Sequence, residues 1–158
     1  MGYLRSLKTK ISKFISLPSN DKIFIFSSLY NLIISLISLK LFKYKKSLDH
    51  YSSRYKIDNS KQNIDLNYIN KLSELNLIAS TILPLKVTCL QRSFTLWLML
   101  RKKGFYSDIK IGVNKKDSFS AHAWVEINNI VINDKSDIRN DFLVLELKDE
   151  NISITDNL

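Results

Sequence analysis

The segment 88–104, TCLQRSFTLWLMLRKKG, contains the clearest structural signal of the chain. Apolar side chains at helical spacing cover most of its circumference, as in a helix buried on nearly all sides: Leu90, Phe94, Trp97, Leu98 and Leu100. Thr88 can cap the start, and three cations followed by Gly104 are typical of a helix end. The sequence therefore predicts a central helix that carries Cys89 in its first turn.

Beyond Gly104 the apolar period changes from helical to alternating. Four strands are predicted in succession, at 109–113, 119–127, 130–133 and 142–147. Asn128 and Asn129 separate the second strand from the third, and asparagine tolerates the left-handed conformation that a tight hairpin needs. Helices followed by an antiparallel sheet place the chain in the α+β class.

Three more helices are predicted upstream, at 1–16, from 23 to a tail near Lys45, and at 65–82, with a loop before the last of them. Asp65 is a suitable N-cap for the last, and Pro84 a suitable stop.

Residues 23–39 carry no charge, but at about 1.5 Å per residue they only just reach the length of a membrane span. Their polar residues collect on one stripe of the helix and leave the rest apolar: Ser27, Asn31, Ser35 and Ser38. We therefore expect a buried packing helix rather than a span. Contact of this segment with lipid is left open.

The composition describes one folded domain without disulfides. The chain has 158 residues, 45% hydrophobic and 25% charged, which excludes a disordered or low-complexity polypeptide. One cysteine and two histidines exclude an internal disulfide and a Cys/His zinc site. A single cysteine is also typical of the reducing cytoplasm, where we expect the protein to be.

The net charge of +9 belongs to the N-terminal half, because residues 1–80 carry 13 Lys/Arg against 5 Asp/Glu and residues 81–158 carry 11 against 10. Such an excess suits an anionic partner, either an acidic peptide or a membrane surface, and it equally suits a solvated surface. Nucleic acid is disfavoured because no recognition motif accompanies the charge.

Three residues predict nucleophilic chemistry. Cys89 opens a helix, where the positive end of the macrodipole favours a thiolate nucleophile. His122 lies on the less apolar face of its strand, and Asp134 follows the partner strand, where it can orient the imidazole. Trp124 and Glu126, on the same face as His122, are candidates for the wall of a substrate cleft.

The hairpin register presents a difficulty for this triad. A strict two-residue turn at 128–129 pairs His122 with Lys135 and Ala123 with Asp134, on opposite faces. We therefore expect an odd-numbered loop or a bulge that pairs His122 with Asp134. With a regular turn, Asp134 would lose its role, and Asp137 or Glu126 would have to be considered.

The motifs Cys89-Leu90-Gln91-Arg92-Ser93, LMLRKKG at 98–104, Ile111-Gly112-Val113 and AHAWVE at 121–126 resemble the transglutaminase-like B2 leader peptidases of lasso-peptide biosynthesis. The resemblance covers roughly residues 85–147. It implies a transglutaminase/papain-like core in which a Cys-bearing helix packs on an antiparallel sheet. It also implies a basic helical N-terminal region at 1–63 and a peptidase core at 64–158.

The resemblance implies a cysteine peptidase that removes the leader from a ribosomally made precursor. Cys89 would be the nucleophile, His122 the general base and acid, and Asp134 its orienter, with neither ATP nor a metal bound to this chain. The implied partners are the precursor leader, a separate leader-binding B1-type protein and an ATP-dependent lasso cyclase. Two alternatives stay open: an amide-forming acyl transferase with the same triad, and a non-catalytic adaptor that docks a peptide or a membrane.

Overall fold

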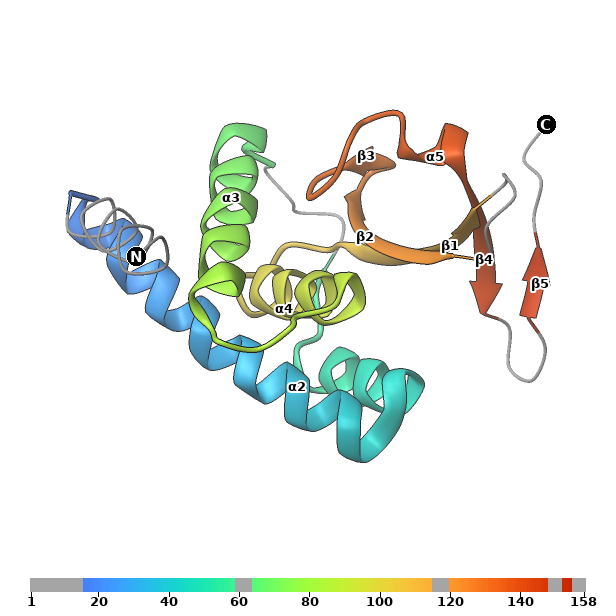
Figure 1. Ribbon diagram of the computed structural model, residues 1–158, viewed down its shortest axis with the longest axis horizontal. Coiled ribbons are helices and arrows are strands. Elements are labelled where there is room, and N and C mark those ends of the chain that lie inside the picture. Colours follow the sequence, from blue (N-terminus) through green and yellow to red (C-terminus); the bar gives the residue numbers. More distant parts are fainter. Residues whose placement is uncertain (1–15, 59–63, 115–119, 148–151, 155–158) are drawn as a thin grey trace, which may run out of the picture.

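The computed structural model describes residues 16–58, 64–114, 120–147 and 152–154, so the helix predicted at 1–16 lies almost entirely outside the described residues. Three helices precede a five-stranded antiparallel sheet in the order β3-β2-β1-β4-β5 (Figure 1). The elements are α2 (Ser19–Arg54), α3 (Leu66–Ile82), α4 (Cys89–Lys102), β1 (Asp108–Asn114), β2 (Ala121–Ile127), β3 (Ile130–Val131), α5 (Ile138–Asp141), β4 (Phe142–Leu147) and β5 (Ile152–Ile154). The predicted α+β class is confirmed.

Helix α4 is central, as predicted, and lies between the other two long helices and the sheet (Figure 1). Every side chain from Ser93 to Leu100 is buried. Thr88 and Gln91 form a reciprocal capping box at its start, and Gly104 follows its end with a positive φ of 85°. The described part of the chain thus holds Cys89 at the first position of a well-anchored helix.

Helix α2 extends further than predicted, because the segment after Lys45 is helical and not a loop. Tyr44, Leu48 and Tyr51 of α2, and Tyr55 directly after it, pack against the core at helical spacing. The rings of Tyr44 and Tyr51 meet the Phe94 ring edge-on, at 6.4 and 6.1 Å between centroids. This stretch was predicted as a loop because most of its residues are polar, and its few apolar residues were not recognised as one face of a helix.

The two arms of α2 meet at a corner. Lys43 has non-helical backbone angles (φ 61°, ψ 172°), and the chain turns there. The hydroxyl of Ser38 donates to Ser47 Oγ at 2.8 Å, so two buried serines join the arms across the corner.

Three residues of the predicted polar stripe, Asn31, Ser35 and Ser38, face inward together with Ser28, whereas Ser27 is exposed. Ser28 donates to Asn76 of α3 at 2.8 Å, and Lys102 of α4 donates to Asn31 at 2.6 Å. Long apolar side chains on the opposite side are exposed, so α2 packs against α3 and α4 along one side and is only partly buried. Within the described residues α2 is the one helix long and apolar enough to cross a membrane, and 33% of its most apolar window is buried.

The shorter elements largely follow the sequence prediction. Asp65 caps α3 by accepting from the amides of Asn67 and Tyr68, and α3 ends before Pro84. Strand β5 was not predicted, and β3 ends two residues early. The proposed division at residue 63 stays a prediction.

Candidate active site

The thiol of Cys89 lies where α4 begins and is partly exposed. The first amides of a helix have no carbonyl partner within it, so they point toward whatever lies before the helix. Ser93, one turn further on and on the same face, is buried and donates to the carbonyl of Ala123 at 2.9 Å. Helix α4 is therefore joined to β2 one turn from Cys89, at the residue beside His122.

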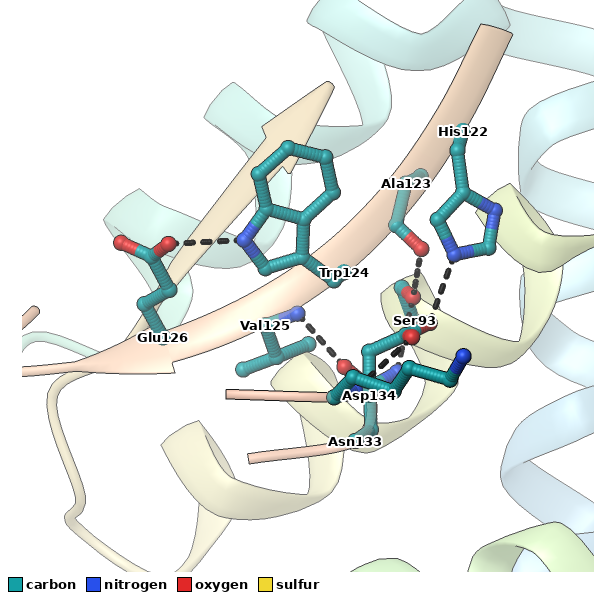
Figure 2. A network of polar contacts seen from close by, with 9 residues as sticks. Ser93, His122, Ala123, Trp124, Val125, Glu126, Asn133 and Asp134 are labelled. Atoms are coloured by element: carbon teal, nitrogen blue, oxygen red, sulfur yellow. Dashed lines mark hydrogen bonds and ion pairs between the residues drawn. The ribbon is translucent and has the colours of Figure 1, made fainter. Parts of the chain in front are cut away.

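His122 and Asp134 are in direct contact (Figure 2). His122 Nε2 lies 2.6 Å from Asp134 Oδ2, and both side chains are about one-fifth exposed. A carboxylate can only accept, so Nε2 carries the proton in this hydrogen bond and Nδ1 is the nitrogen left unprotonated in a neutral ring. The other oxygen, Oδ1, accepts from the backbone amide of Lys135 at 2.9 Å, which fixes the carboxylate.

The hairpin that carries these residues corrects our expectation. The turn is a regular two-residue one, with Glu126 opposite Val131, Ile127 opposite Ile130, and both asparagines at positive φ (49° and 64°). The paired residues 126–131 contain neither the predicted odd-numbered loop nor a bulge. The inference that a regular turn would separate His122 from Asp134 is also wrong.

The explanation lies beyond the turn, at Asn133. Ile132 still donates to the carbonyl of Val125 at 2.9 Å, but the amide of Val125 donates at 2.7 Å to the side chain of Asn133. Asn133 Oδ1 thus takes the place that the carbonyl of Ile132 would fill if the ladder continued. The regular strand pairing ends at this point. The alternation of side chains between the two faces of a strand therefore no longer places Asp134 on the face opposite His122.

Asn133 also connects the hairpin to α4. Its Nδ2 donates to Ser93 Oγ at 2.9 Å, and the same hydroxyl donates to Ala123 (Figure 2). One buried serine on the helix of Cys89 is therefore bonded to the neighbours of both His122 and Asp134.

Aromatic rings pack against the imidazole. The Trp124 ring stacks on it at 6.2 Å between centroids with 25° between the planes, and the Phe142 ring lies 5.3 Å away. Gly112, opposite His122 in the β1–β2 ladder, makes room for these rings. A Cβ there would lie 3.0 Å from Trp124 Cη2 and 2.9 Å from the Cβ of Phe142.

Glu126 is bound away from solvent, with 1% of its surface exposed. It accepts from Trp124 Nε1 at 2.7 Å and from Nε of Arg139 at 2.9 Å, and a second guanidinium nitrogen bonds its other oxygen. Burial opposes its charged form, but the hydrogen bonds from Arg139 and Trp124 outweigh it, so the pKa of Glu126 lies below its usual value. Trp124 and Glu126 are both buried, and a role for them in lining a substrate cleft stays a prediction.

Four residues of this site were missed by the sequence reasoning: Ser93, Asn133, Arg139 and Phe142. Two of them, Ser93 and Arg139, could have been found from the sequence. Ser93 follows Cys89 by one helical turn and was part of the quoted motif. A glutamate on a strand otherwise facing the core requires a cation, and Arg139 is the one that meets it.

A comparison with protein families identifies the superfamily of the chain. A family model described as the Transglutaminase-like superfamily matches residues 38–146, a range that contains Cys89, His122 and Asp134. The chain belongs to the transglutaminase-like superfamily, which typically uses cysteine-based catalysis and commonly acts as a peptidase or acyl transferase. The comparisons with curated proteins and with solved structures gave no match.

Proposed function

We propose that the protein is a cysteine peptidase that cleaves the leader from a lasso-peptide precursor through Cys89, His122 and Asp134. The observation that carries the proposal is the 2.6 Å contact between His122 Nε2 and Asp134 Oδ2, on a hairpin that Ser93 joins to the helix of Cys89. A base oriented by a carboxylate beside a helix-terminal cysteine is the arrangement of cysteine nucleophiles.

The residues divide the reaction between them. His122 takes the thiol proton of Cys89, and the thiolate attacks the carbonyl carbon of the scissile bond, so that a C–S bond forms. His122 then gives a proton to the departing amine as the C–N bond breaks, which leaves a thioester. Water attacks the thioester, His122 takes its proton, and the leader leaves with a free carboxylate while the thiolate is restored.

The developing oxyanion needs hydrogen-bond donors. The backbone amide of Cys89 is one, because a first-turn amide has no partner within its helix. The side chain of Gln91 is partly committed elsewhere, since its Oε1 accepts from the amide of Thr88 at 2.8 Å in the capping box.

The substrate and the partners are proposed from the sequence motifs at 89–93 and 121–126, which resemble those of leader peptidases of lasso-peptide biosynthesis. The proposed reaction takes place in the cytoplasm. The precursor leader is presented by a separate leader-binding protein, and the freed amine is the substrate of an ATP-dependent cyclase.

Membership of the superfamily supports a second candidate, an acyl transferase that uses the same three residues. The thioester is then attacked by an amine, and an amide forms in place of the leader carboxylate. The two reactions share every step up to the thioester, so only the product distinguishes them.

The test is a reaction in water enriched in heavy oxygen. The chain is incubated with a lasso precursor and the leader-binding protein from one gene cluster, and the products are weighed intact. A peptidase gives a leader whose carboxylate carries one labelled oxygen, and Cys89→Ala gives no product. An unlabelled leader joined to an amine would establish the transferase, and an intact precursor with the wild-type chain would contradict both candidates.

A further inference from the structure

The first arm of α2 carries a straight apolar row on its outer side, which we name the outer stripe: Ile23, Tyr30, Ile33, Ile37 and Leu41. Their exposed fractions range from 47% to 66%. They recur at steps of seven, three, four and four residues, so they share one face of the helix. At about 1.5 Å per residue the stripe is about 27 Å long.

The opposite face of α2 forms polar contacts with α3 and α4. Asn31 accepts from Lys102 Nζ, Ser28 donates to Asn76, and Asp21 pairs with Lys71 at 2.8 Å. If α2 crossed a bilayer, these contacts with α3 and α4 would have to break or bring charged side chains into hydrocarbon. The outer stripe is therefore the part of α2 available to lipid without breaking these contacts.

Lysines border the stripe. Lys22 and Lys40 are 18 residues apart, five full turns, so they lie on the same edge of the helix. Lys43 and Lys46 are exposed at the corner beyond Leu41. No Asp or Glu occurs from residue 22 to residue 48.

We propose that the outer stripe docks in the plane of an anionic lipid surface, with its apolar side chains among the acyl chains and the lysines at the headgroups. An apolar face bordered by lysines is the composition of interfacial helices. An acidic peptide would pair with the lysines but leave most of the apolar outer stripe in water, whereas an anionic bilayer accommodates both.

The test uses the full chain in flotation with two kinds of vesicle, phosphatidylcholine alone and phosphatidylcholine with about one quarter phosphatidylglycerol. We expect binding to the anionic vesicles only. The binding is expected to fall strongly when the ionic strength rises from about 0.1 to about 1 M, because the Debye length shortens from about 10 to about 3 Å.

Two variants test the surface itself. Ile33→Ser with Ile37→Ser lowers binding at least about tenfold by removing apolar area from the contact. Lys40→Gln lowers it about fivefold. Ile130→Ser is the matched control, because Ile130 is exposed to the same degree (46% against 47% for Ile33) on β3, away from α2, and it leaves binding unchanged (Figure 1).

Four outcomes would overturn the proposal. These are no binding to either vesicle, equal loss in the Ile130→Ser control, retention on vesicles in carbonate at high salt, and self-association that the double serine variant abolishes. The third would indicate a membrane span and the fourth a second copy as the occupant of the stripe. Circular dichroism and the alkylation rate of Cys89 establish that the double variant is folded.

Discussion

Replacing Asn133 with alanine tests whether its side chain sets the position of Asp134. The change removes two hydrogen bonds, to the amide of Val125 at 2.7 Å and to the hydroxyl of Ser93 at 2.9 Å. The amide of Val125 is then left without its acceptor in a buried strand. One orphaned donor costs about 1–3 kcal/mol and the second bond about 1 kcal/mol, so we expect a loss of about 2–4 kcal/mol in the free energy of unfolding.

The assay is chemical denaturation followed by circular dichroism, combined with the alkylation rate of Cys89 in the folded variant. A purely structural role would lower only the stability, whereas a positioning role also brings the alkylation rate close to that of Asp134→Ala. Asn140→Ala, on the exposed side of α5, is the control and stays within about 0.5 kcal/mol of wild type. A loss below about 0.5 kcal/mol with wild-type alkylation in Asn133→Ala would refute the reasoning.

Three further predictions concern other parts of the fold. Gly112→Ala destabilises the sheet by about 1–3 kcal/mol and changes the fluorescence of Trp124, because the new Cβ meets that ring and the Cβ of Phe142. Arg139→Ala costs about 3 kcal/mol at neutral pH by leaving the Glu126 charge buried, and denaturation series show the deficit shrinking as the pH falls and the carboxyl is protonated. Asp65→Ala costs about 1 kcal/mol through loss of the α3 cap, measured by thermal unfolding.

The sign of the pH prediction follows from the lowered pKa of Glu126. In the wild type this carboxylate contributes stability above its usual pKa, and the contribution is lost as the pH falls through the lowered value. In Arg139→Ala the main stabilising partner is absent, so acid relieves the buried charge instead. An equal loss of stability with acid in both proteins would contradict the assignment.

The sequence predicts most strongly what local chemistry determines. The caps at Thr88 and Asp65 and the two left-handed asparagines were predicted correctly, because each depends on residues within a few positions. The contact between His122 and Asp134 was also predicted, but for a wrong reason, since the turn is regular and a side chain of Asn133 ends the ladder. A side chain that replaces a backbone acceptor leaves no periodic signal.

The orientation of α2 could not be predicted for a different reason. Its polar stripe and its apolar stripe are both visible in the sequence, and ordinary burial favours the apolar one. Most of the polar side is nevertheless inside, because Ser28 and Asn31 bond Asn76 and Lys102, which lie on two other helices. Those partners become known only when the helices are placed in space.

The alkylation rate of the only thiol tests the central claim most directly, with intact mass counting the adducts at about pH 6.5. If Cys89, His122 and Asp134 act together, the wild-type thiol reacts faster than a small free thiol, and both His122→Ala and Asp134→Ala slow it at least about tenfold. A wild-type rate equal to that of the free thiol and unchanged in both variants would contradict the triad.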